Sequence, residues 1–220
     1  MATVVITGAN RGIGLALTKV FLARGDQVYG LCRNASDELN ASGAKVITRV
    51  DIANPETLPE ALKKLGDIKI DVLVNNAGVL HREGLDDWDP VLINHQFRVN
   101  ALGPLLVTEC LQKNLSEGSK VAMITSRMGS MGDNSSGGYY GYRMSKAALN
   151  AAGVSLARDL APKGIAVALL HPGYVQTEMV NYGGDISADD SAANLVKRID
   201  ELNLESSGSF WHANGESLPW

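Results

Sequence analysis

Cysteine is scarce in this chain of 220 residues, which contains only Cys32 and Cys110. The two residues are far apart, and they have neither the number expected of a disulfide framework nor the spacing of metal ligands. Disulfide-stapled secreted domains and zinc-binding modules are therefore excluded. We expect reduced, packed thiols, no bound metal, and a cytoplasmic location.

Charge of one sign and long apolar runs are also missing. The formal net charge is -4, so no basic excess favours nucleic acid or an anionic membrane. No apolar run approaches the roughly 20 residues of a membrane span. No basic segment followed by a cleavable apolar stretch opens the sequence. With 45% hydrophobic and 20% charged residues, the composition is typical of a globular domain.

Short runs of apolar and β-branched residues alternate with helical patterns along the whole chain. Strands are expected at residues 3–7, 27–31, 45–50, 70–74, 120–125 and 165–170. Helices are expected at 13–24, 55–65, 87–114, on the segment that carries Tyr142 and ends at Leu160, and at 192–202. The alternation predicts an α/β fold, a Rossmann-like doubly wound parallel sheet in a single domain over residues 1–220. A variable flap is expected at about 178–190, and a hairpin-like end around Asn214-Gly215.

Three glycines follow the first expected strand, in the pattern Gly8-x-x-x-Gly12-x-Gly14. A strand, a glycine turn and then a helix is the arrangement that a dinucleotide-binding loop requires. Gly8 permits the tight turn, Gly12 lets the backbone approach a pyrophosphate, and Gly14 lets the helix lie close to the sheet. The free N–H groups and the partial positive charge of the helix N-terminus would then bind the phosphates.

Arginines stand where an acidic residue is common in such loops. Sites that prefer NAD usually carry Asp or Glu about 20 residues beyond the glycines, where it binds the ribose 2′-hydroxyl. Here Arg33 follows the second strand and Arg11 lies inside the glycine loop, and two guanidinium groups suit a 2′-phosphate. We therefore favour NADP(H) over NAD(H) as cofactor. Two alternatives remain: both arginines are solvated surface residues, or Asp37 or Glu38 supplies the acid.

Polar and small residues follow two further strands. Asp51, after the third strand, faces an adenine amino group or only caps the next turn. Asn76, Ala77 and Gly78 lie where an open α/β sheet forms its ligand crevice, but they also fit a simple turn.

Asn100 interrupts the helical pattern of residues 87–114. Asparagine is unfavourable inside a helix because its side chain competes for backbone hydrogen bonds. Gly103-Pro104, just beyond, also perturbs a helix. The residue marks a kink filled by water, or it is merely tolerated.

Tyr142 and Lys146 are four residues apart on an expected helix, so they lie on one face. An ammonium group near a phenol stabilises the phenolate and lowers a pKa that is about 10 in water. A phenol of that kind transfers protons at neutral pH. The alternative is an aromatic ring that only packs under a lysine stem.

These motifs occur in one order along the chain. They are the glycine spacing, Asn-Asn-Ala-Gly at 75–78, Asn100, the strand-end Ser126, Tyr142-x-x-x-Lys146, and Pro172-Gly173-x-Val175-x-Thr177. That order resembles the classical short-chain dehydrogenase/reductase family over essentially the full length. The short chain and its end, Phe210 to Trp220, look most like the C-factor and Sniffer-type carbonyl reductases.

The resemblance implies catalytic roles for four residues. Tyr142 would donate a proton to a carbonyl oxygen, or act as the base in the oxidative direction. Lys146 would hold the nicotinamide ribose hydroxyls and lower the pKa of Tyr142. Ser126 would orient the substrate oxygen, and Asn100 would hold a water that relays protons towards Lys146.

The resemblance also implies the cofactor contacts. Asn76, Ala77 and Gly78 would line the adenosine side, and Thr177 with Pro172, Gly173 and Val175 would bind the carboxamide. The rest of the expected set is Gly8, Asn10, Arg11, Gly12, Ile13, Gly14, Arg33, Asp51, Ile52, Tyr142 and Lys146. Ser126 precedes Tyr142 by 16 positions, longer than is usual in the family. The extra residues fall in the Gly/Ser-rich segment 129–138, so they bear on substrate choice rather than on the catalytic residues.

The activity expected is hydride transfer between NADP(H) and the carbonyl or alcohol group of a small or hydrophobic substrate. The alternative is an NADP(H)-binding regulatory or signalling protein with little turnover, which would not need the complete Ser-Tyr-Lys-Asn set. A third possibility is a protein that serves only in assembly. The apolar helices near 95–115 and 142–160 suit a homodimer or homotetramer in each case, and no nucleic-acid or membrane partner is expected.

Overall fold

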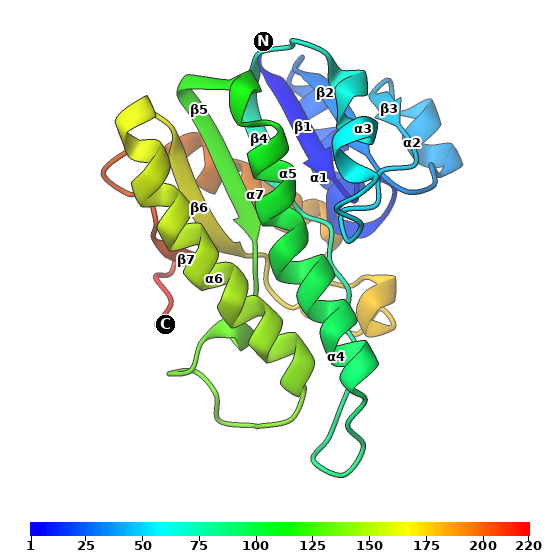
Figure 1. Cartoon of the computed structure of the whole chain (residues 1–220), viewed down its shortest axis with the longest axis vertical. Coiled ribbons are helices and arrows are strands. Elements are labelled where there is room, and N and C mark those ends of the chain that lie inside the picture. Colours follow the sequence, from blue (N-terminus) through cyan, green and yellow to red (C-terminus); the bar gives the residue numbers. More distant parts are fainter.

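The apolar runs of the sequence form one parallel sheet in the computed structural model, which describes residues 1–220 (Figure 1). The strands are β1 (Thr3–Thr7), β2 (Gln27–Leu31), β3 (Lys45–Ile47), β4 (Ile70–Asn75), β5 (Leu115–Ile124), β6 (Ala166–His171) and β7 (Phe210–His212). The helices are α1 (Gly12–Ala23), α2 (Asp37–Ala41), α3 (Leu58–Leu62), α4 (Pro90–Phe97), α5 (Gly103–Cys110), α6 (Tyr140–Leu160) and α7 (Ala188–Glu201). Short 3-10 turns lie at Lys63–Leu65, Gln112–Asn114, Arg127–Gly129, Ala161–Lys163 and Glu178–Val180.

The strand order is β3-β2-β1-β4-β5-β6-β7, and every neighbouring pair is parallel. The chain builds outward from β1 to β3, then returns to β4 on the other side of β1. This reversal between β1 and β4 is the point at which open α/β sheets bind ligands, at the carboxyl ends of the strands. Those ends lie at the lower edge of the sheet in Figure 1. The predicted single, doubly wound Rossmann-like domain is confirmed.

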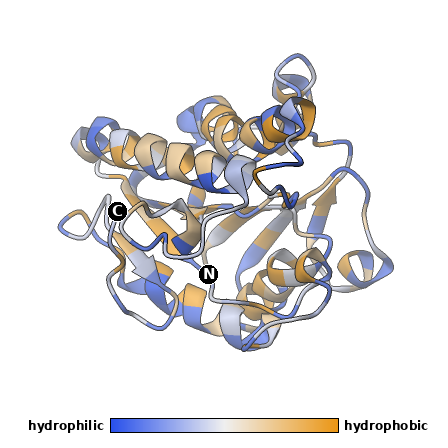
Figure 2. Ribbon diagram, turned by 90° about the horizontal axis from the view of Figure 1, so that it is seen from below, coloured by the Kyte–Doolittle hydropathy of each residue, from blue (hydrophilic) through white to orange (hydrophobic).

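Both faces of the sheet are buried, which is why the strands carry continuous apolar runs. Helices α1 and α7 cover one face, over a cluster of 23 buried residues. Helices α3, α5 and α6 cover the other, over a second cluster of 23. Figure 2 shows the hydrophobic residues gathered on the strands and on the helix sides between these layers.

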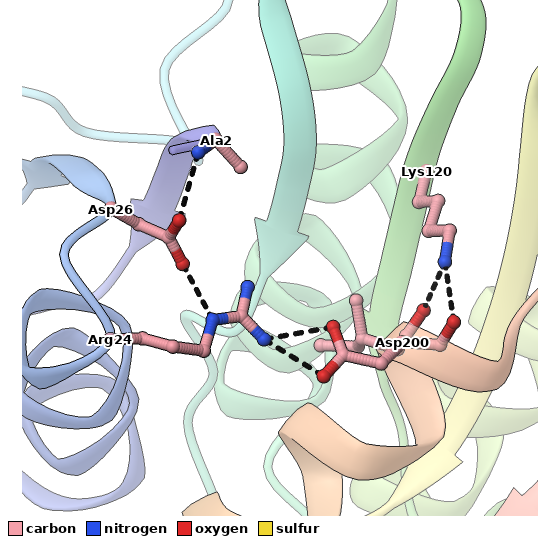
Figure 3. Close-up of polar contacts among 6 residues, drawn as sticks. Ala2, Arg24, Asp26, Lys120 and Asp200 are labelled. Carbon is pink, nitrogen blue, oxygen red and sulfur yellow. Dashed lines mark hydrogen bonds and ion pairs between the residues drawn. The ribbon is translucent and has the colours of Figure 1, made fainter.

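A polar cluster lies at the opposite edge of the sheet, where the strands begin (Figure 3). It joins the ends of α1 and α7 to β5 and to the residues just before β1 and β2. The Asp26 carboxylate accepts hydrogen bonds from the backbone N–H of Ala2 (2.8 Å) and from Arg24 Nε (2.7 Å). Arg24 also donates to both oxygens of Asp200, at 2.9 and 2.8 Å. Lys120 Nζ on β5 donates to the carbonyl groups of Ile199 (2.9 Å) and Asp200 (2.7 Å) at the end of α7. The cluster fixes the C-terminal ends of α1 and α7 against the sheet.

The long helix predicted over 87–114 is interrupted in the structure. A π-helical segment, Arg98–Leu102, separates α4 from α5. Pro104 has no N–H to offer the carbonyl of Asn100, four residues earlier, so the regular α-helical ladder fails there. Wider turns of this kind often lie at functional sites.

The end of the chain also differs from the prediction. Residues 209–220 are expected as a hairpin, but Phe210–His212 instead pairs with β6 in parallel, as a seventh strand. The hairpin partner is reduced to one antiparallel bridge, Trp211 with Ser217. The third strand and the helix after it are shorter than expected, and Asp37–Ala41 forms a short helix that the sequence pattern does not predict.

Candidate functional site

One cavity of about 770 Å³ opens at the carboxyl edge of the sheet. Its wall runs from the glycine loop, past the ends of β2, β4 and β5, to α6 and the segment after β6. The predicted site residues that line it are Gly8, Asn10, Arg11, Gly12, Ile13, Arg33, Asp51, Ile52, Asn76, Ala77, Gly78, Ser126, Tyr142, Lys146, Pro172, Gly173, Val175 and Thr177. Gly14 and Asn100 lie behind this wall.

The glycine loop has the close packing that the sequence predicts. Gly8 has a φ of +67° and Gly12 one of +53°, a conformation that favours glycine. A Cβ atom at Gly14 would lie 2.2 Å from the Gly8 carbonyl oxygen, so only glycine fits where α1 meets the loop. The N-cap Arg11 makes no side-chain cap to α1. The first N–H groups of that helix are thus left for an anion in the cavity.

The two arginines differ in their partners. Arg11 forms an ion pair with Glu178, at the start of the flap. The Arg33 side chain is exposed at the cavity rim and forms no ion pair. Asp37 and Glu38 occupy the first turn of α2 and do not line the cavity, which leaves the rim without the acid of an NAD-type site.

Asp51 and Asn76 have structural partners as well as a place on the cavity wall. Asp51 Oδ1 accepts from the Ala53 N–H at 3.0 Å, so it caps the turn after β3. Asn76 Nδ2 donates to the carbonyl groups of Thr7 (3.0 Å) and Gly8 (3.3 Å). Asn76 therefore holds the ends of β1 and β4 together at the switch point of the sheet.

Ser126, Tyr142 and Lys146 converge on the opposite part of the cavity. Ser126, 7% exposed, follows β5, and its hydroxyl accepts from the Met128 N–H at 3.2 Å. Tyr142 and Lys146 lie one turn apart near the start of α6. Lys146, 4% exposed, has its Nζ 5.8 Å from the centre of the Tyr142 ring. The same Nζ donates to the carbonyl oxygen of Ile124 at 2.9 Å.

The pKa values in this triad correct one expectation. The family resemblance implies a lowered pKa for Tyr142, but burial raises it to about 12, and a hydrogen bond with Ser126 only partly opposes this effect. Burial also lowers the pKa of Lys146 to about 8. The ammonium group is bonded to the Ile124 carbonyl rather than to the phenol, so it does not stabilise the phenolate here.

Asn100 lies behind Ser126, Tyr142 and Lys146 and holds the segments around them in place. Its Oδ1 accepts from the Val79 N–H at 2.8 Å, while Nδ2 donates to the Val79 carbonyl (2.8 Å) and to Ser145 Oγ (3.0 Å). A Cβ atom at Gly78 would lie 3.2 Å from Asn100 Oδ1 and 3.7 Å from Lys146 Nζ. The side chain thus joins the segment after β4 to α6.

The segment after β6 forms the remaining wall. Gly173 has a φ of +94°, and Thr177 Cγ2 lies 3.3 Å from the position of a Cβ atom at Gly12. The flap is anchored beyond it, because Val175 pairs with Ile186 and the Gln176 N–H donates to the Ile186 carbonyl at 2.9 Å.

Sequence reasoning missed four residues at or near this site. Glu83 is buried at the N-terminus of α6, and His171, His212 and Arg127 line the cavity beside Ser126. His171 and Arg127 directly follow strand and site motifs, which is a signal for cavity residues. Glu83 and His212 carry no such signal, because their positions depend on a loop and on the unexpected β7.

Two further features bear on the class of protein. No group of three or more His, Cys, Asp or Glu side chains is placed to hold a metal ion. None of the helices combines the length and the apolar character that crossing a membrane requires.

Known proteins resemble this chain along its whole length. Residues 2–199 match the sequence model of the short chain dehydrogenases. The chain is 38% identical, over all of both proteins, to 1-hydroxy-2-glutathionyl-2-methyl-3-butene dehydrogenase of Rhodococcus sp. (strain AD45). It is 47% identical to C-signal of Myxococcus xanthus over 154 residues, which are 69% of this chain and 93% of that protein.

Solved structures of carbonyl reductases also resemble this chain. NADPH-bound carbonyl reductase from chicken fatty liver superposes with a TM-score of 0.89, at 25% identity, over 100% of this chain and 99% of that one. Carbonyl reductase Sniffer of D. melanogaster has a TM-score of 0.89 at 28% identity, over 100% of both chains. The predicted likeness to C-factor and Sniffer-type proteins is confirmed. The chain belongs to the short-chain dehydrogenase/reductase family of oxidoreductases.

Proposed function

We propose that this protein is an NADPH-dependent reductase of small or hydrophobic aldehydes and ketones, which oxidises the corresponding alcohols in the reverse direction. One observation carries the proposal. The hydroxyl groups of Ser126 and Tyr142 and the ammonium group of Lys146 border the same cavity as a glycine loop with a free helix N-terminus. A dinucleotide bound along that cavity would end beside an acid and a hydrogen-bond donor.

The cofactor preference rests on charge at the rim. Arg11 and Arg33 border the cavity, and no Asp or Glu follows β2 at its wall. Guanidinium groups bind phosphate bidentately, whereas a 2′-hydroxyl calls for an acceptor. The structural relative from chicken is bound to NADPH, which supports NADP(H) over NAD(H).

Ser126 and Tyr142 have separate roles in the proposed reduction. A bound nicotinamide supplies the hydride that the carbonyl carbon gains. Ser126 donates a hydrogen bond to the carbonyl oxygen and orients it, and Tyr142 gives that oxygen its proton. Because burial raises the pKa of Tyr142 to about 12, the phenol is protonated at neutral pH and ready to act as the acid.

Lys146 and Asn100 support this transfer. Lys146, with a pKa lowered to about 8, binds the ribose hydroxyls and passes a proton back to Tyr142. Asn100 fixes Val79 and Ser145 around the lysine, beside the π-helical segment, where a proton-relaying water would be held. In the reverse direction, Tyr142 accepts the alcohol proton.

The competing function is a regulatory or signalling protein that binds NADP(H) with little turnover. The relative named C-signal is the observation that favours it. A complete set of acid, donor and lysine argues against it, because binding alone does not need a phenol beside a serine hydroxyl. The test is the decrease in nicotinamide absorbance with NADPH or NADH and a panel of aldehydes, ketones and quinones. Consumption with NADPH supports the reductase; saturable NADPH binding without consumption of any partner overturns it.

We also propose that the protein forms a homodimer or homotetramer. Apolar side chains on α4, α5 and α6 remain exposed, among them Val91 (75%), Phe97 (38%) and Met144 (55%). An exposed apolar helix face of this kind suits a symmetric interface. Sedimentation equilibrium measures the state, and a monomer at micromolar concentration would contradict the proposal.

A further inference from the structure

Two histidines, His171 and His212, line the cavity but have no part in the reaction described above. His171 ends β6 and His212 ends β7, and the two residues are register partners. The sheet order places them on the side of Ser126 that faces away from the glycine loop. They therefore lie beyond the catalytic residues, where the part of a substrate remote from the cofactor would extend.

Both side chains point to the face of the sheet that α6 covers. Leu169 and Phe210, two residues earlier on each strand, pack in one cluster on that face. The two imidazole rings meet edge to face, with centroids 4.9 Å apart and an interplanar angle of 81°. The pair is thus on the same side as Tyr142, which α6 carries.

The hydrogen bonds of His212 leave a donor free. Its Nδ1 accepts from the Asn214 N–H at 3.0 Å, so a neutral ring carries its proton on Nε2. A Cβ atom at Gly173, on the cavity wall, would lie 3.7 Å from His212 Nε2. The ring edge that carries Nε2 therefore lies next to the cavity wall.

His171, unlike His212, has no hydrogen-bond partner at Nδ1. It is only 7% exposed, and its Nδ1 is buried without a hydrogen-bond partner. A buried polar atom without a partner is rare, and it often marks a functional group.

The surroundings keep both rings neutral. Burial lowers the pKa of His171 to about 3; His212, Arg127 and Lys146 act in the same direction, and Asp133 partly opposes them. Burial and Arg127 also lower the pKa of His212. Arg127 forms an ion pair with Asp133 at 2.7 Å. A neutral imidazole N–H group can donate to a carbonyl oxygen.

We propose that His171 and His212 form a second polar subsite, which binds a further carbonyl oxygen of a dicarbonyl substrate while Ser126 and Tyr142 hold the carbonyl that is reduced. This inference rests on the proposed reductase function and extends it to a substrate class. His212 donates through Nε2, and His171 forms the buried polar floor beside it.

The experiment compares three dicarbonyls with matched monoketones. The pairs are 2,3-butanedione with 2-butanone, 2,4-pentanedione with 2-pentanone, and 2,5-hexanedione with 2-hexanone, so that the spacing of the carbonyl groups varies. We expect His212→Phe to lower kcat/KM for at least one dicarbonyl by about tenfold or more, as for a lost hydrogen bond in a buried site. The matched monoketone should change by less than about twofold. His212→Asn keeps an acceptor for the Asn214 N–H, and it should also lower kcat/KM for the dicarbonyl and not for the monoketone. Equal losses on both members of every pair, or no loss, would overturn the subsite.

A binding measurement separates this subsite from the reductase function. The chain has four histidines, so the imidazole NMR signals can be assigned by substitution. His81 and His95, with rings 5.9 Å apart and outside the cavity wall, serve as internal controls. A dicarbonyl should shift the His171 and His212 signals, with or without NADP⁺, and should leave the His81 and His95 signals unchanged. Monoketones and 2-oxobutanoate should shift the His171 and His212 signals less. If no substrate is turned over but these shifts occur, the reductase function fails and the subsite stands; if the shifts are absent, the subsite is wrong whatever the turnover.

Discussion

The buried carboxylate of Glu83 accepts a hydrogen bond from the backbone N–H of Gly141, 58 residues further along the chain, at 3.3 Å. Gly141 lies in the first turn of α6, next to Tyr142. The N-cap of this helix, Tyr139, has a φ of +53° and makes no side-chain cap. Glu83 also binds Gln96 of α4 and accepts from the Tyr139 N–H through its carbonyl oxygen (2.8 Å). A loop residue therefore caps the helix that carries the proposed acid.

We expect Glu83→Ala to lower kcat by about tenfold or more, because small displacements of a catalytic group are costly. The affinity for the cofactor should hardly change, since the glycine loop is remote from the cap. Glu83→Gln retains an acceptor and should recover much of kcat. Asp86→Ala, in the exposed part of the same loop, is the control. If both Glu83 variants lose stability but keep wild-type kcat, the cap holds the fold and does not position Tyr142.

The cluster of Arg24, Asp26 and Asp200 in Figure 3 predicts two unequal stability effects. The Asp26 side chain is 6% exposed and the Asp200 side chain 53%. Asp26→Ala removes a buried carboxylate and leaves the partly buried N–H groups of Ala2 and of Arg24 Nε without this acceptor, so it should cost about 1–3 kcal/mol in the free energy of unfolding. Asp200→Ala removes only an exposed ion pair and should cost less than about 1 kcal/mol. Urea unfolding measures the free energy of unfolding of both variants. Asp67→Ala, at a fully exposed carboxylate, is the control. A larger loss for Asp200→Ala than for Asp26→Ala would refute this account of the cluster.

Cofactor preference should depend on Arg33. Arg33→Asp removes a cation from the rim and adds an anion, so we expect the Kd for NADPH to rise by about tenfold or more, as for a lost charge-assisted hydrogen bond. The Kd for NADH should change much less. Arg49→Asp makes the same charge change near Arg33, outside the cavity wall, and is the matched control. Titration by cofactor fluorescence gives these constants; equal losses for both cofactors would make Arg33 a bystander.

Lys146 should lower the stability of the fold that it serves. Its pKa falls from 10.5 to about 8 on folding, because burial penalises the ammonium group. Between about pH 8 and 10, the unfolded chain therefore binds more protons than the folded one at this group, and stability rises with pH. Lys146→Met should remove this rise and stabilise the protein at pH 7 by about 1–3 kcal/mol. Unfolding curves at pH 7, 8, 9 and 10 test it, and a less stable Lys146→Met variant would contradict the argument.

Much of the fold and of the cavity wall could be predicted from the sequence, because their signals are local. Gly8 has a positive φ, and a Cβ atom at Gly14 would collide with the Gly8 carbonyl oxygen, so the spacing of the glycines alone indicates the loop. Runs of β-branched residues indicate strands buried on both faces. Tyr142 and Lys146 share a helix, so their spacing alone brings them to one side of the cavity.

The missed features depend on contacts between distant segments. Phe210–His212 is too short to be told from a hairpin arm, and only the pairing with β6 makes it a strand and brings His212 to the cavity. Glu83 stands in a polar loop where a carboxylate is ordinary, and its partner follows 58 residues later. The nearby charge of Lys146 predicts a lowered pKa for Tyr142, but burial, which the sequence does not report, raises it.

The most direct test of the central claim is the turnover of Tyr142→Phe. We measure NADPH consumption with a ketone that the wild-type protein reduces, and NADPH binding by fluorescence. Tyr140→Phe is the control, because Tyr140 packs on Trp88 outside the cavity wall. If Tyr142 is the acid, turnover of Tyr142→Phe falls by about 100-fold or more while NADPH binding and the control remain close to wild type. Turnover that survives the loss of this hydroxyl would show that the proton comes from another group.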